Sequence, residues 1–212
     1  CDEPDFPALI GELGQRFEIL KNTYKPYAGG IVIHPIVDAS LQLRRAHAPD
    51  VNQIERILIQ ASPGAMALCN RPHPRDEFEA HVSLHHWVAS VLIRGSSGIE
   101  VFSDDFIRDP AIVAFQNRIT AVEDPSLGSD SAEMTVHFKD ARTLVSRVEH
   151  GIGSAANPMT DAHLESKFIE LCEGVVGAER CRALITACRR LRRNIASSRA
   201  MAAASTSAAI GQ

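Results

Sequence analysis

The sequence predicts an α+β fold in which a mainly antiparallel sheet is covered by helices. Three observations lead to this prediction. Several short segments alternate apolar and polar residues at the period of a strand. Longer segments between them carry apolar residues at helical spacing. The strand-like segments 132–138 and 142–150 are separated by a connection short enough for a hairpin, so we expect these two strands to pair antiparallel.

The first third of the chain is expected to contain both helices and strands. Residues 6–13 form a short apolar-periodic opening, and residues 16–24 alternate enough to predict a strand. Apolar residues recur at helical spacing over residues 35–47, where Pro35 suits the first turn of a helix because its missing N–H is not needed there. Isoleucines alternate with polar residues over residues 54–62, which predicts a second strand.

The middle of the chain is expected to be mostly helical. Residues 61–74 are rich in proline and predict a loop. One long helix is predicted over residues 76–95, with an aspartate as its candidate N-cap and a glycine at its end. Two shorter helices are expected over residues 102–106 and 111–118, because a proline interrupts the helical pattern between them.

The composition shifts past the last predicted strand, so the remaining chain is expected to form a different structural unit. Amphipathic helices are predicted over residues 161–173 and 179–193. The tail, residues 196–212, is small and polar, and burial cannot offset the entropy of ordering it, so we expect disorder or a loose helix. The sequence therefore divides into an α+β domain over residues 1–155, C-terminal helices over residues 156–195, and a flexible tail.

The composition argues against several functional classes. The formal net charge is −4 and only 5% of the residues are aromatic, which argues against a surface that binds nucleic acid through phosphate contacts and base stacking. Charged residues and histidines interrupt every apolar run before the roughly 20 residues needed to cross a bilayer, so we expect no contact with a membrane. The N-terminus is acidic and does not resemble a signal peptide, which makes a cytoplasmic location the expected one.

The cysteines and histidines do not predict a metal site. The cysteines are odd in number and none forms a C-x-x-C pair, which indicates buried free thiols rather than disulfides or zinc ligands. His81 and His85 lie four residues apart on the predicted long helix, as zinc-binding pairs do, but no glutamate occupies the second position of that motif. The signatures of nucleotide-binding loops are absent as well. The cysteines are Cys1, Cys69, Cys172, Cys181 and Cys188.

The segment YKPYAGGIVIHP can form an anion site. Gly29 and Gly30 can bring backbone N–H groups close to a ligand, and the helix that starts after His34 adds partial positive charge at its N-terminus. Lys25 supplies a full positive charge, so a carboxylate or a phosphate would fit. The alternative is a common Gly-Gly turn before a helix, beside a solvated lysine.

Two further segments hold candidate ligand-binding side chains. His86 follows His85 on the predicted long helix but points elsewhere, and beside Trp87 it is either a packed histidine or a site residue. Arg71 and His73 lie in the predicted loop, and loops on a rigid scaffold often carry function. The alternative for Arg71 is a surface arginine that holds a turn.

Three parts of the sequence, in the same order along the chain, resemble the MmgE/PrpD family. They are KPYAGGIVIHPIVDASLQL, then CNRPHPRDEFEAHVSLHHWVASVLIRG with FSDDFIRDPAIVAFQNRI, and last NPMTDAHLESKF. The resemblance runs from about residue 24 to about residue 191. It implies that this chain is the smaller α+β domain of the family, followed by helices that return to an all-helical domain. The first half of the family members forms that all-helical domain, and nothing in this sequence resembles it.

The resemblance also implies an activity. Enzymes of the family act on small polycarboxylates without a metal or an organic cofactor, by dehydration, decarboxylation or epimerisation. Lys25 and His34 match positions that line the site between the domains, where Lys25 would pair with a substrate carboxylate and His34 would hydrogen-bond or orient. The family often has cysteine or histidine where Gly29 and Gly30 stand. His86 takes the place of a tyrosine that faces the site in some members, and there it could donate a proton.

The leading hypothesis is therefore the C-terminal part of a lyase resembling 2-methylcitrate dehydratase. An epimerase or decarboxylase of the same family is the next hypothesis, and a non-catalytic binding or assembly module is the hypothesis from a different class. The chain would be a fragment, a processed product or one piece of a split protein, inactive alone. Its expected partners are a small di- or tricarboxylate, the missing helical half and a second copy. The last helices would then expose an apolar face formed by Phe168, Leu171, Val175 and Leu184.

Overall fold

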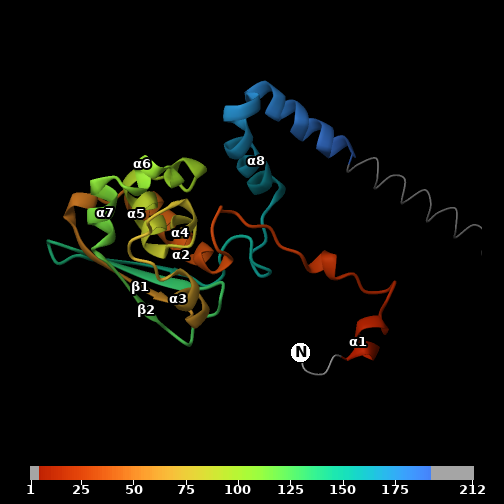
Figure 1. Ribbon diagram of the computed structural model, residues 1–212, viewed down its shortest axis with the longest axis horizontal. Helices are drawn as coiled ribbons and strands as arrows, with labels where there is room; N and C mark the ends of the chain where they lie inside the picture. Colours follow the sequence, from red (N-terminus) through yellow and green to blue (C-terminus); the bar gives the residue numbers. More distant parts are fainter. Residues whose placement is uncertain (1–4, 192–212) are drawn as a thin grey trace, which may run out of the picture. The chain divides into compact units, whose positions relative to one another are not determined.

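The computed structural model describes residues 5–191, and the chain divides after Met159 into two units (Figure 1). The first unit holds a four-stranded sheet and most of the helices, and the second holds two helices. The predicted α+β fold is therefore confirmed. The predicted tail, residues 196–212, and the end of the last predicted helix lie outside the described residues.

The sheet has the strand order β2-β1-β3-β4. β1 (Ile54–Ala61) lies between β2 (Ile119–Glu123), to which it is parallel, and β3 (Ala132–Phe138), to which it is antiparallel. β4 (Thr143–Val148) pairs antiparallel with β3, as the predicted hairpin requires. The prediction of a mainly antiparallel sheet is confirmed, and the pairing of β1 with β2 makes the sheet mixed.

β2 is the strand that the sequence pattern did not predict. It begins at Ile119, directly after the predicted helix 111–118, and Ile119 pairs with Ile57 of β1. β2 lies at the edge of the sheet and only Ile119 is buried, so the segment shows no regular alternation of buried and exposed side chains. Its parallel pairing needs a crossover connection, which the helices between β1 and β2 provide.

One face of the sheet is covered by α2 (His34–His47), which packs on β3 and β4 and against α5 (Leu84–Arg94) (Figure 1). The buried side chains of the strands point into a single hydrophobic core that also includes both helices. Ile57 and Ile59 of β1 and Met134 of β3 are among them. Their regular alternation with more exposed neighbours is the pattern that predicted these strands.

α2 confirms the helix predicted over residues 35–47. Pro35 lies in its first turn, and Arg44 and Arg45 lie in its last turn, where positive charge suits the partial negative charge of the helix end. The guanidinium of Arg44 also donates a hydrogen bond to the carbonyl oxygen of Leu92. This bond ties the end of α2 to the last turn of α5.

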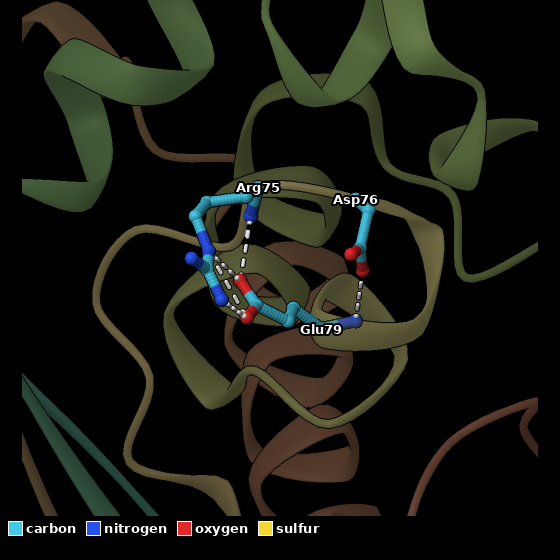
Figure 2. Close-up of polar contacts among 3 residues, drawn as sticks. All are labelled: Arg75, Asp76 and Glu79. Atoms are coloured by element: carbon cyan, nitrogen blue, oxygen red, sulfur yellow. Dashed lines mark hydrogen bonds and ion pairs between the residues drawn. The ribbon is translucent and has the colours of Figure 1, made fainter.

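The long helix predicted over residues 76–95 is in fact two helices. The first, α4 (Glu77–His81), begins after Asp76, whose carboxylate accepts a hydrogen bond of 2.8 Å from the N–H of Glu79. Figure 2 shows this cap together with the guanidinium of Arg75, which donates to both carboxylate oxygens of Glu79. The hydrogen bonds from Arg75 lower the pKa of Glu79 to about 2.

α5 begins anew after Ser83, and this serine explains the break. Its Oγ accepts a hydrogen bond of 3.1 Å from the N–H of His86 and donates one of 2.5 Å to the carbonyl oxygen of Arg71. A serine side chain that bonds the backbone in this way caps a new helix, so the helix before it ends. α5 ends at Gly95, whose φ of 76° is favourable for glycine.

Two local predictions are wrong. Residues 16–24 contain an exposed 3-10 helix, Glu18–Lys21, instead of a strand. Among the described residues no strand pairs with this segment, so its alternating pattern has no sheet to join. The loop predicted over residues 61–74 contains α3 (Pro63–Cys69), which Ser62 caps through a hydrogen bond from the N–H of Ala65. A proline in the first turn and a serine cap are helix-start signals that outweighed the loop-like composition.

The remaining short helices lie close to the predicted positions. α1 (Phe6–Ile10) falls within the apolar opening, and α6 (Asp104–Ile107) and α7 (Pro110–Gln116) correspond to the two helices expected before β2. The carboxylate of Asp109 caps α7 by accepting a hydrogen bond from the N–H of Ala111. Further 3-10 helices are Ile31–Ile33, Val51–Gln53 and Ile99–Phe102.

The second unit consists of α8 (Asp161–Val176) and a helix over residues 178–191. Thr160 and His163 form a capping box at the start of α8, which confirms the predicted helix start. Gly177, with a φ of 84°, separates the two helices. No described helix is long and apolar enough to span a membrane.

The described part of the second unit has almost no core of its own. Cys181 is its one buried residue among those that the structure describes. Three of the four residues predicted to form an exposed apolar face, Leu171, Val175 and Leu184, are exposed, and Phe168 is half-buried. Two helices that bury so little apolar surface gain little stability from it.

Candidate functional site

A pocket of about 360 Å³ lies at the start of α2. Segments that are distant in the sequence form its walls. Thr23 and Ile31 before α2 line it together with His34 and Pro35 of α2. The other walls are Ser129 and Asp130, which precede β3, and the loop 151–155 after β4. The pocket is therefore a product of the tertiary fold, and it lies within the first unit.

His34 is the pocket residue that the sequence predicted. His34 is 3% exposed, and its ring meets the ring of Tyr27 edge-on, with a centroid distance of 5.6 Å. His34 is the first residue of α2, but α2 continues directly from the 3-10 helix Ile31–Ile33, and the N–H of His34 bonds to the carbonyl oxygen of Ile31. The next residue is a proline and has no N–H, so the backbone at this point offers no donor to an anion. Ligand binding by the His34 side chain stays a prediction.

Asp38 lies behind the pocket wall and was not predicted. Its Oδ1 accepts a hydrogen bond of 2.5 Å from the hydroxyl of Tyr27, and its Oδ2 accepts one of 2.6 Å from the N–H of Ile152. Burial raises the pKa of the Asp38 carboxyl above its ordinary value, and the hydrogen bond from Tyr27 acts in the opposite direction. Its position four residues after His34, on the same face of a predicted helix, was the signal that could have identified it.

Two glycines let the loop 151–155 pass close to the other walls of the pocket. A Cβ atom on Gly151 would lie 3.2 Å from the backbone nitrogen of Pro35. One on Gly153 would lie 2.3 Å from the carbonyl oxygen of Tyr24, and Gly153 has a φ of 82°, which favours glycine. No larger residue fits at Gly153 without moving the segment before α2.

Lys25 and the Gly-Gly turn lie next to this wall. The Lys25 ammonium donates a hydrogen bond of 3.3 Å to the carbonyl oxygen of Gly29. A Cβ atom on Gly29 would lie 3.0 Å from Nε1 of Trp87, so this glycine allows close packing on the indole ring. A Cβ atom on Gly30 would make only an ordinary contact of 3.5 Å with Sγ of Cys69. Gly29 thus has a packing function, and ligand binding by the turn stays a prediction.

His86 lies in the hydrophobic core. It is fully buried, its Nε2 bonds to the carbonyl oxygen of Val101 at 2.8 Å, and its Nδ1 accepts from the amide of Gln116 at 3.3 Å. A carbonyl can only accept, so Nε2 must carry the proton and the ring is a neutral tautomer. Burial also lowers the pKa of His86. The structure places this histidine as a packed residue, the alternative that the sequence left open.

The structure does not bring His86 and Lys25 into the pocket at His34. Neither residue lines that pocket. A chain of aromatic contacts leads from His34 through Tyr27, Trp87 and Phe102 to His86, with centroid distances of 6.2 Å between Tyr27 and Trp87 and 5.0 Å between Trp87 and Phe102. The convergence of Lys25, His34 and His86 on one site stays a prediction, and so does a catalytic function of His86.

Arg71 is exposed, and its backbone carbonyl oxygen accepts the hydrogen bond from Ser83 Oγ. This bond involves only the main chain of Arg71, so ligand binding by its side chain stays a prediction. It does not line the pocket at His34.

His81 and His85 are separated by the break between α4 and α5. His81 Nδ1 bonds to the carbonyl oxygen of Ala28, and His85 Nε2 bonds to Oδ1 of Asn70 at 2.9 Å. Burial lowers the pKa of His85 to about 4, so it is neutral at pH 7. Within residues 5–191, no group of three histidine, cysteine, aspartate or glutamate side chains is arranged to hold a metal ion.

The fold and the pocket define an α+β domain with a pocket at the start of α2, followed by helices whose described part has almost no core of its own. The chain belongs to the MmgE/PrpD family, because the profile of the MmgE/PrpD C-terminal domain matches residues 27–192. His34 and Asp38 lie within the matched range. The match confirms the resemblance of the three sequence segments to this family.

The chain is also similar to a cis-aconitate decarboxylase from Mus musculus. The two are 23% identical over 179 residues, which covers 79% of this chain and 36% of the relative. The chain therefore spans little more than a third of the length of this curated relative.

Proposed function

We propose that this chain is the substrate-binding C-terminal part of a lyase that acts on small di- or tricarboxylates without a metal or an organic cofactor. Family membership supports the enzyme class. The single structural observation that carries the substrate class is the pocket that the His34 side chain lines together with the hydroxyl-bearing residues Ser129 and Ser154. Imidazole N–H groups and hydroxyl groups can donate hydrogen bonds to a carboxylate.

In this proposal His34 and Lys25 both bind the substrate. His34 donates a hydrogen bond to a substrate carboxylate inside the pocket. Lys25 does not line the pocket, so its ammonium must leave the carbonyl oxygen of Gly29 and move toward the ligand to pair with a second carboxylate. Dehydration, decarboxylation and epimerisation can all begin with proton transfer next to a carboxylate, so each needs a positioned acid or base and cations that stabilise the developing charge.

Dehydration of a substrate like 2-methylcitrate is the reaction that we propose first. Decarboxylation is the second candidate, because the relative from Mus musculus is a cis-aconitate decarboxylase. Epimerisation is the third. A non-catalytic binding module is the proposal from a different class.

In this proposal the second unit binds a partner. Its exposed apolar side chains would be covered by the helical half of the family enzyme, and two such assemblies would form a homodimer. The helical half would supply the remaining acid and base groups. We propose a cytoplasmic location for this assembly.

Binding of citrate to the chain, measured by isothermal titration calorimetry at low and high salt, tests the substrate class. We expect weak binding that salt reduces further, because charges in an open site are strongly screened. Lys25→Ala should weaken binding by about 1–3 kcal/mol, the range for losing a hydrogen bond to a charged group. Lys21→Ala is the matched control, since Lys21 is exposed and pairs with Glu18 instead.

Two results would contradict the proposal. The first is the absence of saturable citrate binding, which would remove the substrate class. The second is rapid turnover of 2-methylcitrate by this chain alone, which would show that the site needs no helical half.

A further inference from the structure

The structure assigns Asp38 as the positioning residue of the anion site. Its carboxylate holds Tyr27 and the loop 151–153 in the places from which His34 faces a substrate carboxylate. The inference rests on the proposed function of the pocket and names the group that sets its geometry. Asp38 does not line the pocket, so it acts through its neighbours.

Each oxygen of the Asp38 carboxylate binds a different segment of the chain. Oδ1 accepts from Tyr27, which lies 11 residues earlier, and Oδ2 accepts from the N–H of Ile152, which lies 114 residues later. Hydrogen bonds to an ionised carboxylate are shorter and stronger than those between neutral groups. The side chain thereby joins α2 to two walls of the pocket.

Tyr27 connects Asp38 to His34, because its hydroxyl bonds to Asp38 and its ring contacts the ring of His34. Asp38 and His34 are four residues apart on α2, so they lie on the same face of the helix. The Tyr27 ring meets the His34 ring edge-on, with an interplanar angle of 85°, and also contacts the ring of Trp87. A Tyr27 ring that lost its bond to Asp38 could change the orientation of the imidazole.

The loop 151–153 has little room to adjust if its bond to Asp38 is lost. Gly151 lies against Pro35, and Gly153 lies against the backbone of Tyr24. The N–H of Ile152, between these two glycines, is the group that Asp38 holds. Asp38 therefore fixes the middle of a loop whose two neighbouring residues form the pocket wall.

The burial of the Asp38 carboxyl group has a free-energy cost when the group is charged. Burial disfavours the charged form, and here it raises the pKa of Asp38 despite the hydrogen bonds from Tyr27 and Ile152 and the positive charge of Arg45. An asparagine has nearly the same shape, but one of its two terminal atoms is an NH2 donor, so it cannot accept hydrogen bonds at both the Oδ1 and the Oδ2 position. The substitution Asp38→Asn therefore breaks the double tie with almost no change in volume.

The test uses the full chain and two readouts. Nuclear magnetic resonance follows the ring signals of His34 and the amide signals of Gly151 and Gly153, and calorimetry follows citrate binding. We expect Asp38→Asn to shift all three sets of signals and to weaken citrate binding roughly tenfold, the effect of one lost charge-assisted hydrogen bond. Asp105→Asn is the matched control, because Asp105 is exposed on α6, and it should change neither readout.

Tyr27→Phe keeps the inference testable if Asp38→Asn does not fold, because it removes only one of the two bonds. It should shift the His34 signals more than those of Gly151. When both variants fold, the double variant should weaken binding by less than the two single effects combined, because both changes break the same bond.

Unchanged His34 and loop signals in folded Asp38→Asn would overturn the inference, and so would weaker citrate binding without any such shift. Shifted signals in a protein that binds no citrate even as wild type would support the positioning function and refute the proposed substrate class.

Discussion

The hydroxyl of Tyr27 donates a hydrogen bond of 2.5 Å to Oδ1 of Asp38. This bond joins the segment before α2 to the second turn of that helix. Together with the bond from the N–H of Ile152 to Oδ2, it joins the segment before α2 and the loop after β4 to one carboxylate. Ile152 lines the pocket at His34, whereas Tyr27 and Asp38 lie outside its lining.

Removal of the Tyr27 hydroxyl should destabilise the protein. Tyr27→Phe leaves Oδ1 of a buried carboxylate without this donor, which should reduce the free energy of unfolding by about 1–3 kcal/mol. Urea denaturation measures the change. Tyr24→Phe is the control, because Tyr24 is 56% exposed, and its effect should stay within about 0.5 kcal/mol. Equal effects of both substitutions would show that the bond to Asp38 contributes nothing.

Gly29 should not tolerate a larger side chain. A Cβ atom there would lie 3.0 Å from Nε1 of Trp87 and 3.2 Å from the carbonyl oxygen of His81. Gly29→Ala should cost about 1–3 kcal/mol of stability, as overpacking does. It should also change the fluorescence of Trp87, the one tryptophan of the sequence.

Gly64→Ala is the matched control for Gly29→Ala. Gly64 lies in α3 and a Cβ atom there would meet nothing within 4 Å. The added methyl group should be neutral or stabilise by up to about 1 kcal/mol, because alanine favours a helix over glycine. Thermal unfolding of both variants measures the difference, and a stable Gly29→Ala with unchanged fluorescence would contradict the close packing on Trp87.

His85 should make the protein less stable in acid. Burial lowers its pKa in the folded state to about 4, from an ordinary value of 6.5. Between these values the unfolded chain binds the proton and the folded chain does not, so the free energy of unfolding falls as the pH drops from 6.5 to about 4. The loss is at most about 3 kcal/mol for a shift of this size.

The substitution His85→Gln should remove this part of the pH dependence. Urea denaturation at neutral pH and near pH 4 compares the two proteins, with His47→Gln, an exposed histidine, as the control. Burial of His86 acts in the same direction and remains in the variant, so a smaller acid effect persists. An identical pH dependence in His85→Gln and the wild type would contradict the prediction.

The exposed side chains of the second unit should cause self-association. Val175 is 84% exposed on α8, and exposed apolar faces associate to remove their surface from water. Val175→Ser should lower the average mass in sedimentation at high concentration and reduce the binding of an apolar dye. Val145→Ser on β4, where valine is 58% exposed, is the control and should leave the mass unchanged. A monomer at all concentrations without dye binding would refute the prediction.

Most of the local structure could be predicted from the sequence. α2, β1, the β3–β4 hairpin and the capped start of α8 were predicted at close to their observed positions. Their signals are local: a period of apolar residues, a proline in a first turn, a threonine cap. The break between α4 and α5 also has a local signal, the serine cap at Ser83. Apolar residues continue at helical spacing on both sides of Ser83, so the pattern predicted one continuous helix.

The site was only partly predictable. The Gly-Gly turn and His34 were identified from residue type and position, and the family was recognised from the order of three segments. His86 was assigned to the site because it matches a family position, although the same sequence equally allowed a packed histidine. Only the surrounding groups, Val101 and Gln116, show that it is packed.

The sequence alone thus determined the α+β class, the family and most of the elements, because periodicity, caps and motifs are properties of neighbouring residues. The tertiary structure decided the parallel pairing of β2, the packing of Gly29 on Trp87 and the meeting of Tyr27, Asp38 and Ile152 behind the pocket. These features join residues far apart in the chain. Whether such residues meet depends on how the whole core packs, so no local sequence pattern could predict these contacts.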